Sequence, residues 1–355
     1  MYTDSVANHP LSLFSGWFDG GHCQGIALDE RNGFAYFSFT TMLVKTDFQG
    51  RLIGSVRGLM GHLGCIAFHP EDGCVYGSLE YKDDVIGRAV RERSGGGHVE
   101  DAFYVVRFDG DRITCPDLDA CRDGVMTAVY LKEVMDDFHG EAVVNGRVFP
   151  HRYGCSGIDG LSFGKIPGGA DPKEYLFVCY GIYSDLERTD NDHQVLLCYD
   201  TAGWDAFAAP LSQTALHHQG PEKPDRKFFV YTGNTTYGVQ NLEYDPCTGH
   251  FLMAVYRGKK PAFSNHPLYV IDGGSAPESR PLRGLSETGE TLSLLHTENG
   301  VDPTGIEFPF GSTGLYSFGD GFFAVSEEEK SELGYATHVR LYRWDGHGPL
   351  QAVEK

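Results

Sequence analysis

A short unit recurs five times along the chain: a hydrophobic strand that runs into an Asp-centred turn and ends at Gly. The five copies occupy residues 43–50, 104–110, 195–203, 268–273 and 339–346. Repetition of one supersecondary unit constrains the architecture more than any single residue, because each copy needs an equivalent place in the fold. Five copies of a strand and a turn therefore predict a radial array of β-sheets.

Each copy is preceded by a segment with a second shared pattern: a small residue, an aliphatic residue, a small or acidic residue and a larger apolar residue. These upstream segments are residues 24–29, 64–69, 159–163, 240–245 and 304–309. Such alternation is typical of a strand whose two faces pack differently. A turn and a second strand follow, so that the Asp–Gly strand becomes the third of its unit, and a fourth usually precedes the next unit.

Four antiparallel strands repeated around an axis make a β-propeller, so the sequence predicts an all-β, five-bladed propeller as a single domain over residues 1–355. The expected blades cover residues 22–60, 62–135, 155–232, 238–297 and 302–347. Residues 11–18 lie upstream of the first unit, and the last unit lacks a fourth strand. We expect residues 11–18 to close the ring within that last blade. Six blades are the alternative, because residues 111–153 are long enough to contain further strands.

The composition indicates the cellular compartment of the protein and excludes some classes of partner. The formal net charge is −20, and an acidic surface repels nucleic acid and anionic membranes, so neither is an expected partner. The sequence has no stretch of transmembrane length, and residues 1–4 lack the features of a secretory signal. Several of the nine cysteines fall inside apolar strands, as buried thiols in a reducing compartment do. We therefore expect a cytoplasmic protein, with its oligomeric state left open.

Long insertions indicate which face of the propeller carries the site. In an antiparallel blade, the loops that lead into the first strand and the loops between the second and third strands emerge on the same face. Nearly all the long insertions fall in these two loop classes: residues 82–101, 136–153, 183–193, 257–266 and 327–337. Long loops on compact domains often bind ligands. The predicted site is therefore the mouth of the central channel on that face.

Polar residues at the starts of the first strands should ring this mouth. One column reads Gln24, Gly64, Asp159, Gln240 and Thr304, and the column two residues earlier reads His22, His62, Gly157, Gly238 and Asp302. Oxygen donors that converge on an axis suit a divalent cation, calcium or magnesium first, while histidines widen the choice to transition metals. The predicted ligands are Asp159, Gln24 and Gln240. The alternative is that these side chains hold channel water or cap strand ends.

At these positions the chain resembles the gluconolactonase and senescence-marker-protein group of propellers, with a weaker echo of NHL-type repeats. The resemblance rests on Asp159-Gly160-Leu161 and Gln24-Gly25-Ile26, which take places similar to the inner-strand ligand motifs of that group. It implies a catalytic divalent ion held by Asp159 and Gln24, and a hydrolase of lactone or ester type. That group has six blades and a Glu where this chain has Gln24.

Glu243 and Glu307 offer a second chemistry, because they share one place in two repeats where the first two repeats carry alanine. A carboxylate in a packed column needs a partner or a solvated pocket. Together with Asp159, a pair of them could act as general acid and base on a glycosidic bond, and five-bladed propellers also serve as scaffolds for furanosidases. The alternative is that both glutamates pair with an arginine or hydrogen-bond between blades.

Side chains on the insertion loops and at strand ends are the predicted substrate contacts. Cations near the mouth would attract a carboxylate or phosphate, and tyrosines there could form platforms for sugars. The predicted substrate-binding residues are His22, His62, Tyr81, His151, Arg152, Tyr183, Arg257 and Asp302. The alternative is that the loop cations are solvated and that the tyrosines pack in the core.

Three functions stay open. The first is binding of a small polar metabolite, sugar-like or anionic, with metal-dependent hydrolysis as its most concrete chemistry. The second is a metal-free glycosidase that uses Asp159, Glu243 and Glu307. The third is a non-catalytic scaffold for a protein partner, because a propeller fold does not by itself select a function.

Overall fold

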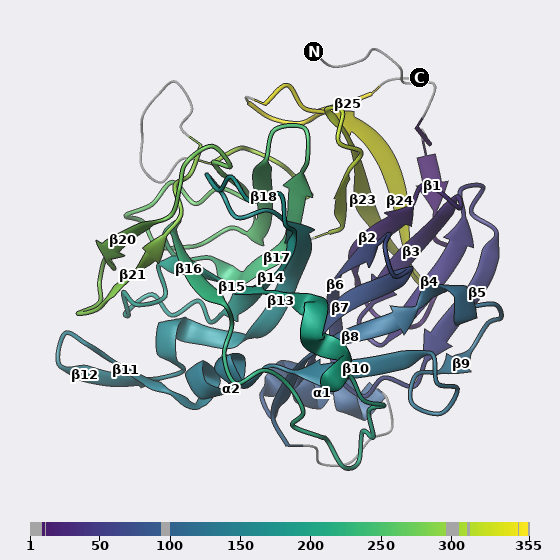
Figure 1. The fold of residues 1–355 in the computed structure, drawn as a ribbon, viewed down its shortest axis with the longest axis horizontal. Helices are drawn as coiled ribbons and strands as arrows, with labels where there is room; N and C mark the ends of the chain where they lie inside the picture. The colour runs from purple at the N-terminus through teal and green to yellow at the C-terminus, as the bar shows by residue number, and fades with distance from the viewer. Residues whose placement is uncertain are drawn as a thin grey trace.

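The structure, a computed structural model, describes residues 9–10, 12–93, 100–295, 305–310, 313–346 and 348–353. The chain folds into antiparallel sheets arranged around a central channel, which is a five-bladed β-propeller (Figure 1). The predicted fold class is confirmed, and the six-bladed alternative is wrong. Among the residues just given, no helix is long and apolar enough to cross a membrane.

Blades one to three have the predicted four-stranded order. Blade one consists of β2 (Cys23–Asp29), β3 (Phe34–Phe39), β4 (Met42–Asp47) and β5 (Leu52–Arg57). Blade two consists of β6 (His62–His69), β7 (Cys74–Tyr81), β8 (Ala102–Asp109) and β10 (Met126–Tyr130). Blade three consists of β13 (Cys155–Gly164), β14 (Tyr175–Ile182), β15 (His193–Tyr199) and β16 (Arg226–Tyr231). The first strands lie nearest the axis, where β2 contacts β6 and β6 contacts β13.

Blade four has three strands, and further chain runs along its outer edge. Its strands are β17 (Thr236–Asp245), β18 (His250–Tyr256) and β19 (Leu268–Ile271). Single bridges join Leu268 to Ile306 and Ile271 to Leu294. Residues 304–309 were predicted to begin blade five, but Ile306 of that segment lies at the outer edge of blade four, so that prediction is wrong.

Blade five begins later in the chain than predicted, because its first strand follows residues 304–309. Its strands are β22 (Leu315–Ser317), β23 (Phe322–Ser331) and β24 (Gly334–Arg343), and β25 (Gln351–Ala352) pairs with β24. The segment 313–317 repeats the small-then-aliphatic pattern of residues 304–309. It departs from the rest of the pattern, because Tyr316 stands where a small or acidic residue is expected and Ser317 where a larger apolar one is, so the pattern selected residues 304–309.

The ring is closed by the N-terminal strand, as predicted. β1 (Ser12–Phe14) pairs antiparallel with β24, placing Ser12 opposite Arg340. Leu13 is 2% exposed and packs between blades five and one, with Phe37 and Val339 in the same cluster. β1 therefore supplies the fourth strand of blade five from the opposite end of the chain.

Smaller elements extend the blades. β9 (Leu118–Asp119) pairs in parallel with β5, β21 (Thr288–Thr291) pairs in parallel with β16, and β20 (Glu278–Pro281) pairs with β21. The hairpin of β11 (Glu141–Val144) and β12 (Arg147–Pro150) forms a separate two-stranded sheet. Short 3-10 helices cover Gly110–Arg112, Arg152–Gly154 and Thr201–Ala206.

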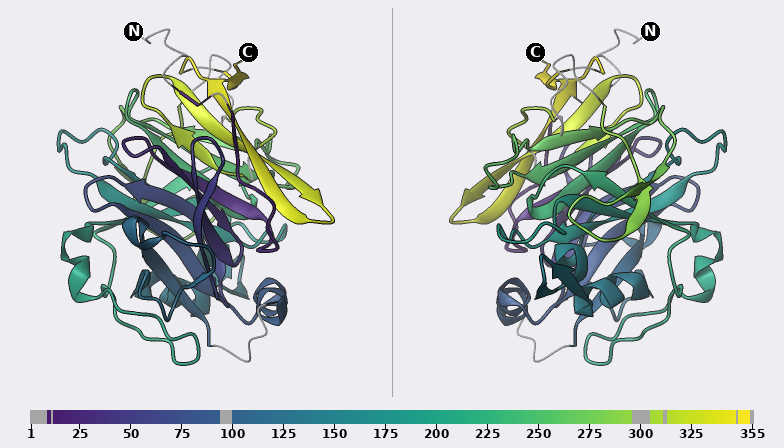
Figure 2. Two further views of the ribbon diagram at one scale, coloured as in Figure 1. Left: turned by 90° about the vertical axis from the view of Figure 1, so that its right-hand side faces the viewer. Right: turned by 90° about the vertical axis from the view of Figure 1, so that its left-hand side faces the viewer.

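Two α-helices lie in the insertions. α2 (Lys132–His139) packs against β13, and α1 (Val85–Arg93) projects from the same face as the tip of the β23–β24 hairpin (Figure 2). Both α1 and that hairpin tip belong to insertions between second and third strands. The long insertions therefore do share a face, as the strand order predicts.

The cysteines within the sheets are buried free thiols, as expected for Cys23, Cys65, Cys179 and Cys198. Burial raises the pKa of each of these thiols. A buried thiol with a raised pKa is a poor nucleophile, so these cysteines contribute packing and not chemistry.

Closure of the ring can be tested at Leu13. We expect Leu13→Ala to lower the free energy of unfolding by about 2–5 kcal/mol, because it removes a buried side chain from the interface between the first and last blades. Denaturant unfolding measures this change. Ser12→Ala, on the exposed side of the same strand, is the control, and equal effects of the two substitutions would contradict a closing role for β1.

Candidate functional site

A β-bulge interrupts the innermost strand of four blades at the predicted column of polar residues. Between two paired positions, β2 has one residue more than β3, namely Gln24, and β17 has Gln240 in the same situation. The same excess occurs at Gly64–Cys65 in β6 and at Asp159–Gly160 in β13. A bulge turns a side chain out of the regular alternation of a strand. The bulges explain how polar side chains leave the packed blade faces and line the channel.

Five of the predicted site residues line one cavity of about 160 Å³: Gln24, His62, Asp159, Tyr183 and Gln240. Its other polar and aromatic walls come from Glu80, Lys82, Asp84, Ser156, Tyr237 and Tyr256. Asp84 and Tyr183 belong to two of the long insertions. The cavity therefore lies at the channel mouth on the face where the sequence predicts the site.

A buried ion pair supports one wall of the cavity. The Lys82 ammonium donates to Glu80 Oε1 at 2.6 Å and to the main-chain oxygen of Ser156 at 2.8 Å, and both charged residues are 5% exposed. Glu80 Oε2 accepts from Ile158 N at 3.1 Å, and His62 Nδ1 lies 3.4 Å from Glu80 Oε1. Burial acts to raise the pKa of Glu80, but the charge of Lys82 and the contact with His62 hold it below its usual range. Glu80 is therefore an ionised carboxylate in a fully bonded setting.

Asp159 stands beside this pair with a different environment. It is 8% exposed, and its Oδ1 has no hydrogen-bond partner among the described residues. Burial raises the pKa of Asp159 to about 7, with the charge of Glu80 acting in the same direction, although His62 and Lys82 oppose the shift. A Cβ at Gly64 would lie 2.3 Å from Asp159 Oδ1, so only glycine there leaves room for this carboxyl group.

Gln24 presents a second unsatisfied atom to the cavity. Its Nε2 lies 3.1 Å from His62 Nε2, while its Oε1 is buried without a partner among the described residues. Buried polar atoms are nearly always hydrogen-bonded to protein or to an ordered molecule. Gln24 Oε1 and Asp159 Oδ1 are therefore two buried atoms of residues in the cavity wall that still need a hydrogen-bond donor.

Three tyrosines form the rim. The Tyr183 hydroxyl donates to Asp84 Oδ2 at 2.9 Å. Tyr237 is 49% exposed, has a φ of 67°, and lies with its ring centroid 5.5 Å from that of Tyr256 in an edge arrangement. A left-handed backbone at a bulky residue costs about 1–3 kcal/mol, and such strain is concentrated at binding sites. The strain at Tyr237 places an exposed aromatic ring at the mouth.

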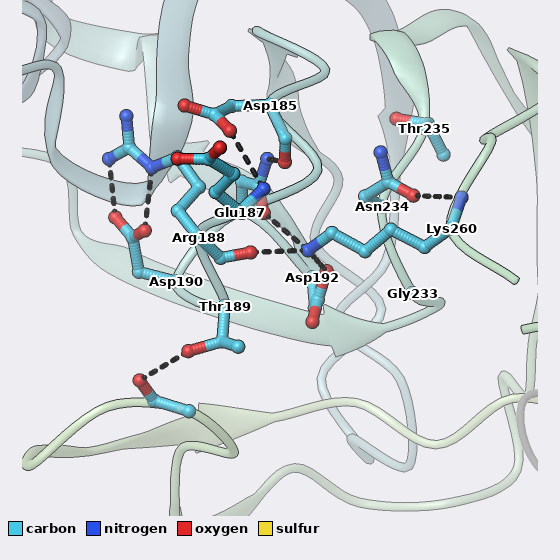
Figure 3. A network of polar contacts seen from close by, with 12 residues as sticks. Asp185, Glu187, Arg188, Thr189, Asp190, Asp192, Gly233, Asn234, Thr235 and Lys260 are labelled. Carbon is cyan, nitrogen blue, oxygen red and sulfur yellow. Dashed lines mark hydrogen bonds and ion pairs between the residues drawn. The ribbon is translucent and has the colours of Figure 1, made fainter. Parts of the chain in front are cut away.

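A buried polar network anchors the loop that carries Tyr183 (Figure 3). Lys260, from the loop after β18, donates from Nζ to Asp192 Oδ1 at 2.5 Å and to Asn191 Oδ1 at 2.8 Å. Asn191 Nδ2 donates in turn to the main-chain oxygen of Tyr183 at 3.0 Å. In the same network Arg188 forms a buried ion pair with Asp190 at 2.6 Å. Blade four thereby fixes a loop of blade three at the edge of the cavity.

Three predicted substrate contacts lie outside the lining of the cavity. Tyr81 is buried in the core, with its hydroxyl 2.9 Å from Gln213 Oε1. Arg152 pairs with Glu287 at 2.6 Å. His151 Nδ1 donates to the main-chain oxygen of Phe138 at 2.6 Å, and its ring lies 5.0 Å from that of Tyr183. His151 therefore supports Tyr183 from behind.

The remaining predicted residues that the structure describes also lie outside the lining of the cavity. Glu307 is 63% exposed at its side chain and forms an ion pair with Arg257. Glu243 Oε1 accepts from Ser317 N of blade five at 2.7 Å, and burial raises the pKa of Glu243 to about 8. Both glutamates thus make the contacts that the alternative interpretation predicts. His22 pairs with Glu328, and Asp302 lies outside the described residues.

Strand alternation would have pointed to the residues that the sequence analysis missed. Tyr81 was selected because it ends a second strand at the mouth, and it packs against blade one. Its neighbours Glu80 and Lys82 must then point to the opposite face of the strand, toward blade three. The available signal was a Glu and a Lys on either side of a tyrosine that packs in the core.

The predicted metal ligands share the cavity, but their chemistry suits a hard divalent cation poorly. Gln24, Asp159 and Gln240 supply one carboxyl group and two amides, and the Lys82 ammonium occupies the same cavity. Calcium and magnesium usually take several oxygen ligands with more than one carboxylate. Across the described parts of the chain, no group of three or more His, Cys, Asp or Glu side chains is placed to hold a metal ion.

No protein-family model matches the chain, and no curated protein sequence matches it. Among the solved structures that are similar to it at low identity are the following three. The Dos1 propeller has 11% identity and a TM-score of 0.31, covering 94% of this chain and 82% of that one. The holo form of the pyranose dehydrogenase PQQ domain from Coprinopsis cinerea has 13% identity and a TM-score of 0.33, covering 89% and 81%. A protein of unknown function from Bacteroides caccae has 10% identity and a TM-score of 0.29, covering 79% and 88%.

At these identities and TM-scores, the neighbours carry no information about the activity of this chain. The resemblance to the gluconolactonase group is not confirmed by them. The propeller assignment rests on the sheet topology, and the site rests on its own geometry.

Lys260→Met tests the anchoring network. We expect the free energy of unfolding to fall by about 3–5 kcal/mol, because the substitution leaves the buried Asp192 carboxyl group without its cation. Lys259→Met, at the exposed neighbouring lysine, should change it by less than about 0.5 kcal/mol. Denaturant unfolding of the two variants gives the comparison, and similar losses in both would count against the network.

Asp159→Asn tests the environment of that carboxyl group through pH. The ordinary pKa of 3.8 rises to about 7 in the folded protein, so the native state keeps a proton that the unfolded state has released. The protonated Asp159 carboxyl group therefore contributes to the free energy of unfolding below about pH 4, and this contribution is lost as the pH rises through about 7. As the pH rises from about 4 to about 7, the free energy of unfolding of Asp159→Asn should therefore increase relative to that of the wild type. A difference that does not change with pH would contradict the raised pKa.

Proposed function

We propose that the cavity at the channel mouth binds a small sugar-like molecule and that Asp159 acts on it as a general acid. The observation that carries this proposal is the buried Asp159 carboxyl group, whose Oδ1 lacks a partner among the described residues in a cavity walled by polar and aromatic side chains. A structural carboxyl group at such a position would be expected to have its bonds satisfied by protein, as those of Glu80 are.

The cavity suits hydroxyl groups better than a free anion. Gln24 Oε1 and Asp159 Oδ1 are acceptors that need donors, and a hydroxyl supplies one while still accepting from other groups. Lys82, the only lysine in the described lining of the cavity, is already paired with Glu80, and Asp84 adds a further negative charge. Tyrosine rings at the rim offer apolar faces on which a sugar ring can rest. A neutral polyhydroxylated molecule meets all three conditions.

Two carboxyl groups in the cavity have environments that push their pKa values apart. The pKa of Asp159 is raised to about 7, and that of Glu80 is held below its usual range. Such separation is typical of an acid paired with a carboxylate that stays ionised. In the proposed reaction, water adds to the carbon of a glycosidic or ester bond while Asp159 protonates the departing oxygen. The proton released by the water restores Asp159, while Glu80 stays ionised in its pair with Lys82.

A metal-dependent form of this hydrolysis is a second candidate, because the bulges place all three predicted ligands in the same cavity. Elemental analysis of purified protein tests it. A stoichiometric divalent ion that is lost in Asp159→Asn would support the metal. Protein without a stoichiometric ion, and with activity unchanged by chelators, would rule it out.

Asp159→Asn also tests the general acid. On chromogenic glycosides and sugar lactones, we expect the variant to lower kcat about 100-fold or more, which is the usual worth of a positioned acid. The loss should be smallest with substrates whose leaving groups need no proton. Glu307→Gln, at the exposed carboxylate paired with Arg257, is the matched control and should keep wild-type activity.

Two results would count against the proposal. One is a variant Asp159→Asn that turns over a wild-type substrate at the wild-type rate. The other is the absence of both turnover and saturable binding across neutral sugars, sugar lactones and glycosides, which would favour the non-catalytic scaffold.

A further inference from the structure

A second cavity lies at the outer rim of the propeller, away from the channel. The β20–β21 hairpin follows blade four in the chain but pairs with β16, the outermost strand of blade three (Figure 1). Between the hairpin and the ends of β15 and β16 is a cavity of about 140 Å³. The cavity exists because the hairpin extends the sheet of blade three while residues 292–295 leave it for the edge of blade four.

The lining of this rim cavity carries positive charge. Arg280 and Arg283 line it together with the hydroxyl residues Thr291 and Ser293, and the described lining contains no aspartate or glutamate. The Arg283 guanidinium lies 4.4 Å from the centroid of the Tyr231 ring, which orients it across the cavity wall. Arg280 is held by Glu278 at 2.6 Å. Two arginines lining one cavity stand out on a chain whose net charge is −20.

His193 forms the inner wall of the cavity. It is 2% exposed, its ring packs 5.2 Å from that of Tyr231, and its buried Nδ1 has no hydrogen-bond partner among the described residues. Burial, together with the charge of Arg283, lowers the pKa of His193 to about 4. The imidazole is therefore neutral at physiological pH and keeps one N–H that can donate.

We propose that the rim cavity binds the carboxylate or phosphate group of a small organic anion. Arg283 binds the charge, and Arg280, whose Nε and Nη2 donate to Glu278, adds its Nη1 group, since guanidinium groups match the geometry of both anions. His193 and the hydroxyl of Ser293 complete the polar contacts, and Tyr231 and Leu292 offer an apolar surface to the body of the ligand. This site is independent of the channel mouth and of the function proposed for it.

Calorimetric titration of the full chain with inorganic phosphate and with benzoate, at matched ionic strength, tests the proposal. We expect saturable binding of at least one of the two, and their relative affinity identifies the anion. Arg283→Gln should weaken that binding about tenfold or more, as loss of a hydrogen bond to a charged group does. The imidazole resonances of His193 should shift during the same titration.

Two controls separate this site from others. Arg257→Gln removes an exposed arginine elsewhere on the surface, and Asp159→Asn alters the channel mouth, so both should leave the anion affinity unchanged. The proposal is overturned if neither anion binds saturably. It is also overturned if Arg257→Gln weakens binding as much as Arg283→Gln, because anion binding would then depend only on the net charge of the protein.

Discussion

Five inner strands converge on one narrow axis, and this crowding governs the rest of the structure. At the axis the backbones approach so closely that a Cβ at Gly160 of β13 would lie 2.7 Å from Val239 Cγ1 of β17. A regular strand would direct full-sized side chains into its neighbours there. Bulges at Gln24, Asp159 and Gln240 resolve the conflict by turning these residues toward the channel. The polar cavity is therefore a consequence of closing a small ring.

Burial of polar groups at the axis costs free energy, and ion pairs and hydrogen bonds compensate some of these groups better than others. Glu80, Lys82 and His62 compensate one another through short contacts and a main-chain amide. Asp159 receives no comparable compensation, and a shift of its pKa from 3.8 to about 7 corresponds to roughly 4 kcal/mol against the ionised form. A fold under selection for stability alone would favour an amide or an apolar residue there. Burial of the Asp159 carboxyl group outweighs its contacts with His62, Lys82 and Gln240. This imbalance is a reason to place function at Asp159 and not at the better-bonded glutamates.

The sequence predicted the architecture well because repetition and strand order are local properties that can be read along the chain. They located the face of the insertions, the closing strand and the bulged column of Gln24, Asp159 and Gln240. The failures have two physical causes. Glu307 was placed on an inner strand because residues 304–309 match the repeat pattern better than residues 313–317, whereas strand pairing puts the latter in blade five. The contact of Lys82 with Ser156 joins different blades, and no local pattern encodes it.

The pairing of β1 with β24 has a consequence for how the chain is made. Ser12 meets Arg340, so β1 is synthesised long before the strand with which its backbone hydrogen bonds form. Contacts between such distant segments slow folding, and an unpaired strand is open to wrong partners meanwhile. Four blades can assemble on the way, yet the inner strands have no fixed spacing until the ring closes. The site at the axis is thus completed last, and a ribosome-bound chain that lacks blade five holds the chemical groups of the site without their geometry.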